Sequence, residues 1–190
     1  MENKYILAVP NFSDGRRQEV IDAISGTIKN KEGVKLVTCE PEHDFNRTVL
    51  TIIGEPAPLK EALLEMAAKS YELIDMTVQE GTHPRIGGQD TIPLFPLMNT
   101  TVEECKELAE EIGKELFAKF QVPIFFSGEN ARTEDKKSIS FIRKGQYEGL
   151  KALLEDNNHP DYESRKPDLS VDGKLSQNMG QLLYQQIKRG

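Results

Sequence analysis

A short segment, residues 81–90, holds three side chains suited to acid–base chemistry on an anionic molecule. Its sequence, Gly-Thr-His-Pro-Arg-Ile-Gly-Gly-Gln-Asp, contains the imidazole of His83, the guanidinium of Arg85 and the carboxylate of Asp90. Its glycines allow positive φ, and Pro84 restricts His83 to extended or turn geometry, so a rigid loop is expected. An imidazole changes charge near neutral pH, and an arginine binds carboxylates through paired hydrogen bonds. The segment is therefore a candidate proton-transfer site, although a lone histidine in a glycine-rich loop is more often only a turn residue.

Composition narrows the classes of protein to which the chain can belong. Its 190 residues suffice for one domain with a full core and a tail. The formal net charge of -7 argues against binding nucleic acid or a membrane surface, both of which need a basic footprint. The sequence has no apolar run long enough to span a bilayer and no apolar signal core, so a soluble cytoplasmic protein is expected. Cys39 and Cys105 lack metal-ligand spacing and are expected to be buried free thiols.

Hydrophobic periodicity predicts alternating strands and helices. Strands are expected over residues 5–10, 34–39, 47–54, 91–97 and 122–126, and helices over residues 17–29, 56–73, 101–120 and 147–154. The second and third strands are expected to form an antiparallel pair, and the prolines of 91–97 indicate an edge strand. Thr101 and Glu104 resemble a capping box at the start of the helix 101–120. This order predicts an α+β fold, with a ferredoxin-like mixed β-sheet and helices layered on one face.

The chain divides near residue 162. Residues 1–162 form the predicted domain, and a boundary is indicated by the polar, proline-containing stretch 156–161. Residues 163–190 are a polar tail, within which 176–188 has an incomplete apolar stripe typical of a helix.

Three further segments collect polar side chains near predicted strands and helices. Asn11 follows the first strand, the stretch 43–48 precedes the third strand, and residues 142–150 surround the start of the last helix. Each has a plain structural explanation: surface cations such as Arg143 and Lys144 are usually just solvated, and Arg47 can pair with Asp44.

Taken together, these segments resemble the formiminotransferase family, enzymes that act on formiminoglutamate in histidine breakdown. The resemblance rests on residues 10–13, 43–48, 54–56, 73–76, 83–87 and 142–150, in that order, and extends from about residue 5 to residue 162. It implies transfer of a formimino group from N-formimino-L-glutamate to N5 of tetrahydrofolate, in folate-dependent one-carbon metabolism. It also implies that His83 is the catalytic residue, that tetrahydrofolate is a substrate, and that no metal is needed.

The chemistry of this reaction agrees with a histidine. Attack of an amine on an amidine-like carbon gives a tetrahedral intermediate, so one proton must leave the attacking nitrogen and another must reach the departing nitrogen. Both substrates carry carboxylates, for which arginine and lysine are suitable partners, and asparagine amides suit the pterin or the formimino group. The predicted substrate- and folate-binding residues are Asn11, His43, Asn46, Arg47, Arg85, Gly87, Asp90, Arg143 and Lys144.

The chain departs from the family pattern after residue 162. Family members continue through a glycine and a small-residue linker into a second subdomain, whereas this chain has Glu-Ser-Arg-Lys-Pro at 163–167. A sheet face deprived of its neighbour favours a homodimer, a separately encoded second half, or the tail as cover. The alternatives to an enzyme are a folate-binding or interaction module without transfer activity, and a regulatory domain of the ACT type that binds amino acids. The ACT-type alternative gives no reason for the His83 loop, which comprises residues 81–90.

Overall fold

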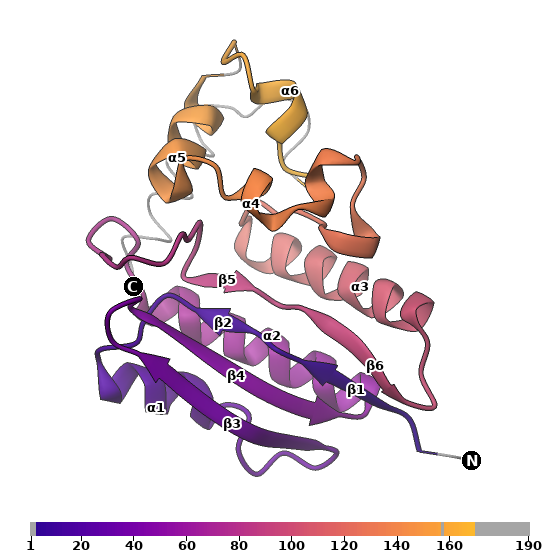
Figure 1. Cartoon of the computed structure of the whole chain (residues 1–190). Coiled ribbons are helices and arrows are strands. Elements are labelled where there is room, and N and C mark those ends of the chain that lie inside the picture. The colour runs from indigo at the N-terminus through magenta and orange to yellow at the C-terminus, as the bar shows by residue number, and fades with distance from the viewer. Residues whose placement is uncertain (1–2, 157, 170–190) are drawn as a thin grey trace.

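The computed structural model describes residues 3–156 and 158–169, and its centre is an antiparallel sheet (Figure 1). Two extended segments of the sheet are each interrupted and form two short strands. The first comprises β1 (Tyr5–Ala8) and β2 (Asn11–Phe12), and the second comprises β5 (Gln89–Thr91) and β6 (Leu94–Met98). Both interruptions contain a proline, Pro10 and Pro93, which has no N–H to donate to a ladder.

The remaining strands are β3 (Val34–Glu42) and β4 (Arg47–Gly54). Across the sheet, β3 pairs with β4, β4 with β1 and β2, β1 with β6, and β2 with β5. Every one of these pairs is antiparallel, so the expected β3–β4 pair and the edge position of the proline-containing strand are confirmed, while the prediction of a mixed sheet is wrong. The reason is that β1 and β3, which run in the same direction, are separated by β4.

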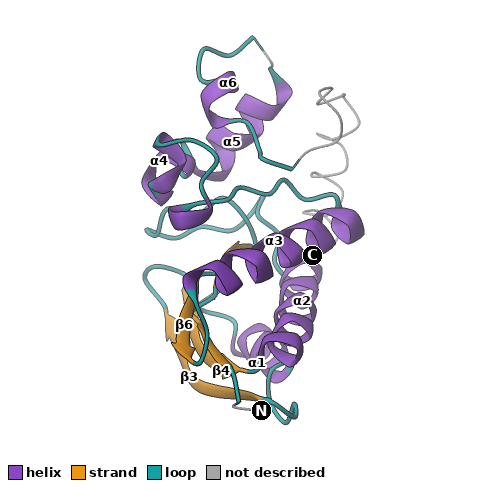
Figure 2. Ribbon diagram, turned by 90° about the vertical axis from the view of Figure 1, so that its right-hand side faces the viewer, coloured by secondary structure: helices purple, strands orange, loops and turns teal. Residues whose placement is uncertain are grey.

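Helices cover one face of this sheet. Figure 2 shows α1 (Gln18–Gly26), α2 (Pro56–Leu73) and α3 (Val102–Phe120) on the same side of the strands. β4 buries alternate residues against them, and Leu50 and Ile52 are fully buried. The predicted capping box starts α3: the side chain of Thr101 accepts from the N–H of Glu104, whose carboxylate accepts from the N–H of Thr101.

The opposite face of the sheet carries apolar side chains in one row. Phe95, Leu7 and Ile53 are register partners across β6, β1 and β4, and Phe95 is 48% exposed. Cys105 is buried in α3 and Cys39 is half-buried in β3, and both are free thiols. No helix within residues 3–156 and 158–169 is both long and apolar enough to cross a membrane.

A cap of short helices, which we define as residues 128–165, lies beyond α3 and the β5 edge (Figure 1). It contains the 3-10 turns Gly128–Asn130 and Asp135–Lys137, and the helices α4 (Ile139–Ile142), α5 (Gln146–Glu155) and α6 (Tyr162–Arg165). Leu150, Leu153 and Leu154 form its small core.

The predicted strand at 122–126 is wrong, because Ile124 makes only an isolated bridge to Leu169 and joins no sheet. Beyond the predicted boundary at residue 162, Asp168 contacts the rest of the protein. Its carboxylate pairs with buried Lys136 at 2.6 Å and accepts the N–H of Phe126 at 2.7 Å. The predicted helix at 176–188 lies outside the described residues.

Replacement of Ile52 by alanine is expected to lower the free energy of unfolding by about 2–5 kcal/mol, because its fully buried side chain would leave a cavity. Ile53→Ala on the other face of the same strand is the matched control, with an expected loss of about 1 kcal/mol. Urea unfolding of both variants measures the difference. Equal losses would contradict the assignment of the helix-covered face as the core.

Candidate functional site

A cavity of about 690 Å³ lies where the β5–β6 edge of the sheet, α3 and the cap meet. α3 and the segment 122–126 supply much of its apolar lining, including Ile112, Leu116 and Phe126. Its polar lining includes Asn11, Arg47, His83, Gln89, Asp90 and Arg143. An apolar hollow with a few convergent polar groups is the usual form of a small-molecule site.

The glycines of the His83 loop serve close packing, and none of them uses the positive φ that a glycine allows. Positive φ among the described glycines occurs at Gly33, Gly128 and Gly145, and at none of the three in the loop. A Cβ on Gly81 would lie 2.3 Å from the carbonyl oxygen of Phe45, so no larger residue fits at that position. Gly81 therefore allows the loop to lie directly against the turn between β3 and β4.

His83 is half-buried and lines the cavity. Burial lowers the pKa of its imidazole below the ordinary value of 6.5, and the positive charges of Arg47 and Arg143 lower it further. The carboxylate of Asp90 acts in the opposite direction on this pKa without reversing the shift. The lowered pKa favours the neutral imidazole, which is the form that can accept a proton.

Phe45 lies beside two of these groups, and it was not among the predicted site residues. Its ring meets the His83 ring edge to face, with centroids 6.2 Å apart, and the Arg47 guanidinium lies 5.4 Å from its centroid. The signal in the sequence was a large apolar residue within the polar turn 43–46. Arg47 pairs with Glu42, its register partner across the hairpin, and the suggested pair with Asp44 is wrong.

Asp90 and Arg143 form an ion pair at the cavity. The Asp90 side chain is 1% exposed, accepts the N–H of Ile86 at 2.7 Å and also receives Nη2 of Arg143. Nε of Arg143 and Oδ1 of Asn11 are both buried without a hydrogen-bond partner among the described residues. An unsatisfied buried donor and acceptor in one cavity suit a ligand that offers both kinds of polar group.

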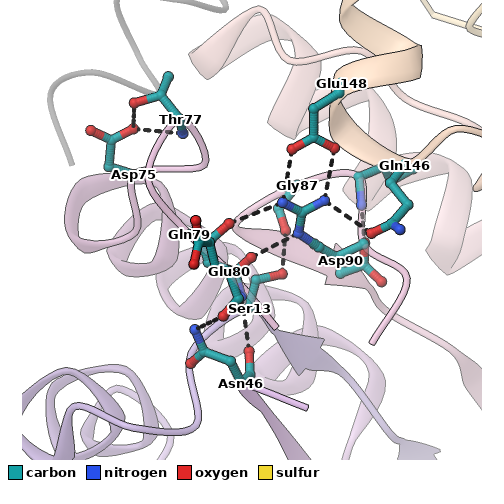
Figure 3. A network of polar contacts seen from close by, with 12 residues as sticks. Ser13, Asn46, Asp75, Thr77, Gln79, Glu80, Gly87, Asp90, Gln146 and Glu148 are labelled. Carbon is teal, nitrogen blue, oxygen red and sulfur yellow. Dashed lines mark hydrogen bonds and ion pairs between the residues drawn. The ribbon is translucent and has the colours of Figure 1, made fainter. Parts of the chain in front are cut away.

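Arg85 has a different environment from the one expected of a substrate ligand. All five of its N–H groups are used: Nε and Nη2 donate to Gln79, Nη1 to Gln146 and Glu148, and Nη2 also to Glu148. These bonds measure 2.7–3.0 Å, and Figure 3 shows Gln79, Gln146 and Glu148 converging on this one guanidinium. Arg85 is buried and is absent from the cavity lining, and its five hydrogen bonds join the segment before His83 to α5.

The other predicted residues divide between the cavity and the surface. Gly87 lines the cavity, and its carbonyl accepts the hydroxyl of Ser13 at 2.7 Å. Asn46 joins three chain segments, because its Oδ1 accepts the N–H of Gly15 and its Nδ2 donates to the carbonyl of Glu80. His43 and Lys144 are exposed, next to Asp44 and Asp161 respectively. Asn46, His43 and Lys144 are not brought to the cavity.

No group of three or more His, Cys, Asp or Glu side chains suited to a metal ion occurs in the described part of the chain. The cavity lining itself offers charged and amide groups, among them the imidazole of His83.

The sequence is similar to known proteins over most of its length. Residues 5–174 match the model of the formiminotransferase domain, N-terminal subdomain. The chain is 39% identical over 166 residues to the formimidoyltransferase-cyclodeaminase of Dictyostelium discoideum, an alignment that covers 87% of this chain and 30% of that protein. It is 35% identical over 164 residues to the glutamate formimidoyltransferase of Streptococcus pyogenes serotype M1, covering 86% and 55% of the two chains.

A third relative, the glutamate formimidoyltransferase of Thermoplasma acidophilum, is 34% identical over 157 residues, with 81% of this chain and 52% of that protein covered. The chain thus spans about half the length of the glutamate formimidoyltransferases that it matches. Since the matched region includes both the His83 loop and the cap, the chain belongs to the formiminotransferase family, as its N-terminal subdomain.

Proposed function

We propose that this chain carries the proton-transferring half of a site that moves a formimino group from N-formimino-L-glutamate to N5 of tetrahydrofolate. The observation that carries the proposal is a half-buried imidazole with a lowered pKa, at a cavity bearing two arginines, in a chain of this family. Relatives named glutamate formimidoyltransferase support the same reaction. A ferredoxin-like arrangement of the sheet and a cytoplasmic location are part of this proposal.

The proposed reaction needs one base that later acts as an acid. N5 of tetrahydrofolate attacks the formimino carbon, whose C=N bond becomes a single bond, and neutral His83 takes the proton from N5. The tetrahedral intermediate then expels the glutamate nitrogen, which receives the proton from the His83 imidazolium as the C=N bond forms again on the folate. Protons balance within the site, and general acid–base catalysis of this kind contributes about 10²–10⁴-fold in rate.

The proposed binding roles follow the groups at the cavity. Arg47 and Arg143 supply positive charge for substrate carboxylates in a chain that is acidic overall. The free acceptor of Asn11 suits an N–H of the pterin or of the formimino group. Gly87 and Asp90 contribute shape and charge at the same place, whereas His43, Asn46, Arg85 and Lys144 have no support from the cavity for a ligand contact.

A second copy of the chain or a separate chain is proposed to complete the site. This rests on the relatives, which extend well beyond the region matched here, and on the uncovered apolar row of Leu7, Ile53 and Phe95. The same partial coverage favours the second candidate function, a folate-binding or interaction module that performs no transfer.

His83→Ala is expected to reduce formimino transfer by about 10²–10⁴-fold, because the only proposed base is removed. Turnover of formiminoglutamate and tetrahydrofolate over a range of chain concentrations measures the rate. His159→Asn is the control, since His159 lies in the cap and is absent from the cavity lining. Folate binding without turnover in the wild-type chain at every concentration would favour the binding module.

The imidazole of His83 is expected to titrate below pH 6.5 in NMR spectra recorded against pH. Arg47→Gln should raise this pKa, because a positive charge that disfavours the imidazolium is lost, and Asp90→Asn should lower it. The acid limb of the pH–rate profile should move in the same directions. A wild-type pKa above 6.5 would argue against His83 as the neutral base.

A further inference from the structure

Two arginine–carboxylate pairs join the His83 loop to the cap in opposite directions. In the first pair, Arg85 of the loop binds Glu148 in the first turn of α5. In the second pair, Arg143 of the cap, which follows α4, binds Asp90 in β5. Both pairs span more than 50 residues of sequence. The loop and the cap are therefore held together at two points by charge-assisted hydrogen bonds.

The first pair is bidentate and is buried on one side only. Nη1 and Nη2 of Arg85 donate to the two carboxylate oxygens of Glu148, each at 3.0 Å. The Arg85 side chain is 8% exposed, whereas that of Glu148 is 65% exposed. Arg85 also lowers the pKa of the Glu148 carboxyl, so this group is ionised at neutral pH.

A relay of hydrogen bonds continues from this pair to the far side of the loop. Gln79 accepts from Nε of Arg85 at 2.7 Å, and its amide nitrogen donates to the carbonyl of Asn46 at 3.1 Å. Asn46 in turn donates to the carbonyl of Glu80 at 2.7 Å. Figure 3 shows Glu148 of α5, Gln79 and Asn46 along this path from α5 to the β3–β4 turn. In sequence, His83 lies between Gln79 and Arg85, which this path connects.

On the N-terminal side of His83, the N–H and the hydroxyl of Thr82 donate to the carbonyl of Asp44 at 3.3 and 3.2 Å. The His83 ring contacts the exposed ring of Phe45, and Thr82 and Pro84 on either side of it are exposed. Hydrogen bonds hold the loop near residues 79–82 and again at residues 85–90, and α5 is linked to it through Arg85. A shift of Arg85 would therefore be passed to His83, two residues away, and small displacements of a reacting group cost large factors in rate.

We propose that Glu148 is a positioning residue for formimino transfer, which holds His83 at the cavity through Arg85. The proposal rests on the function proposed above. Glu148→Gln removes the charge but keeps an amide oxygen that can accept from the buried Arg85, and the Glu148 side chain is 65% exposed, so we expect only a small change in global stability. Loss of the Glu148 charge should therefore displace the His83 loop without unfolding the protein. Loss of a contact in the hydrophobic core would instead lower the free energy of unfolding.

Glu148→Gln is the test, and Glu155→Gln is the matched control, because Glu155 lies on the same helix, is exposed and has a long ion pair, 4.0 Å, with Lys151. In Glu148→Gln we expect an unchanged urea midpoint and a His83 pKa that moves up towards 6.5. We also expect at least a several-fold faster amide exchange at Ile86, whose N–H is held by Asp90 in the same loop. The control should match the wild type in all three measurements.

Turnover provides the second arm of the test. With an active transferase, Glu148→Gln should lower kcat by roughly 10–100-fold with KM changed less than about two-fold, since a positioning defect acts on the reacting group. Gln146→Ala, which removes one acceptor of Arg85 and no charge, should give a smaller effect of the same kind.

The two proposals fail in different ways. Wild-type His83 titration and Ile86 exchange in Glu148→Gln would overturn the role of Glu148, whatever the activity. A wild-type chain without turnover at any concentration, combined with altered His83 titration in Glu148→Gln, would instead overturn the proposed transfer and leave Glu148 as the residue that holds His83. A lowered urea midpoint in Glu148→Gln, with His83 titration unchanged, would reduce its role to stability.

Discussion

The buried guanidinium of Arg85 is the interaction on which the geometry of the candidate site depends. A charged group out of water is tolerated only when its donors are satisfied, and Arg85 achieves this with five hydrogen bonds to Gln79, Gln146 and Glu148. Gln79 precedes the His83 loop, and Gln146 and Glu148 belong to α5. The requirement to satisfy one cation thus fixes how the cap meets the sheet edge, and the cavity lies where they meet.

The electrostatics of the cavity follow from that arrangement. Docking the cap brings Arg143 to Asp90, and the hairpin brings Arg47 to the same cavity, so His83 lies among two cations and one anion. The imbalance adds to burial and favours the neutral imidazole. The same cations that would attract an anionic substrate therefore also keep the base in the state that can accept a proton.

Local patterns in the sequence predicted local structure well. A run of apolar and β-branched residues identified β4, the Thr101–Glu104 pair marked the start of α3, and prolines indicated the edge strand, because each of these signals acts within a few residues. The segment 122–126 has the composition of a strand, yet it pairs with no strand of the sheet; Ile124 makes one isolated bridge to Leu169, and the segment lines the cavity together with α3 and the cap. Propensity cannot show whether a partner strand exists.

Part of the candidate site could be predicted from residue types, whereas pairs between distant residues could not. His83, Asp90 and Arg143 were selected by residue type, and the structure brings them to one cavity. Arg85 was selected as a ligand-binding arginine. Its pair with Glu148 could not be predicted, because the two residues are 63 positions apart and no local pattern links them. Arg47 was assigned to Asp44 as its neighbour in sequence, whereas the extension of β3 to Glu42 sets the register that makes Glu42 its partner.

The most direct test of this account is cross-relaxation between the ring protons of His83 and Phe45 in the wild-type chain and in Arg85→Lys. A lysine cannot replace five directed donors, so the loop should move and the cross-peaks seen in the wild type should disappear. Cross-peaks of unchanged intensity in the lysine variant would contradict the claim that Arg85 holds His83 in place.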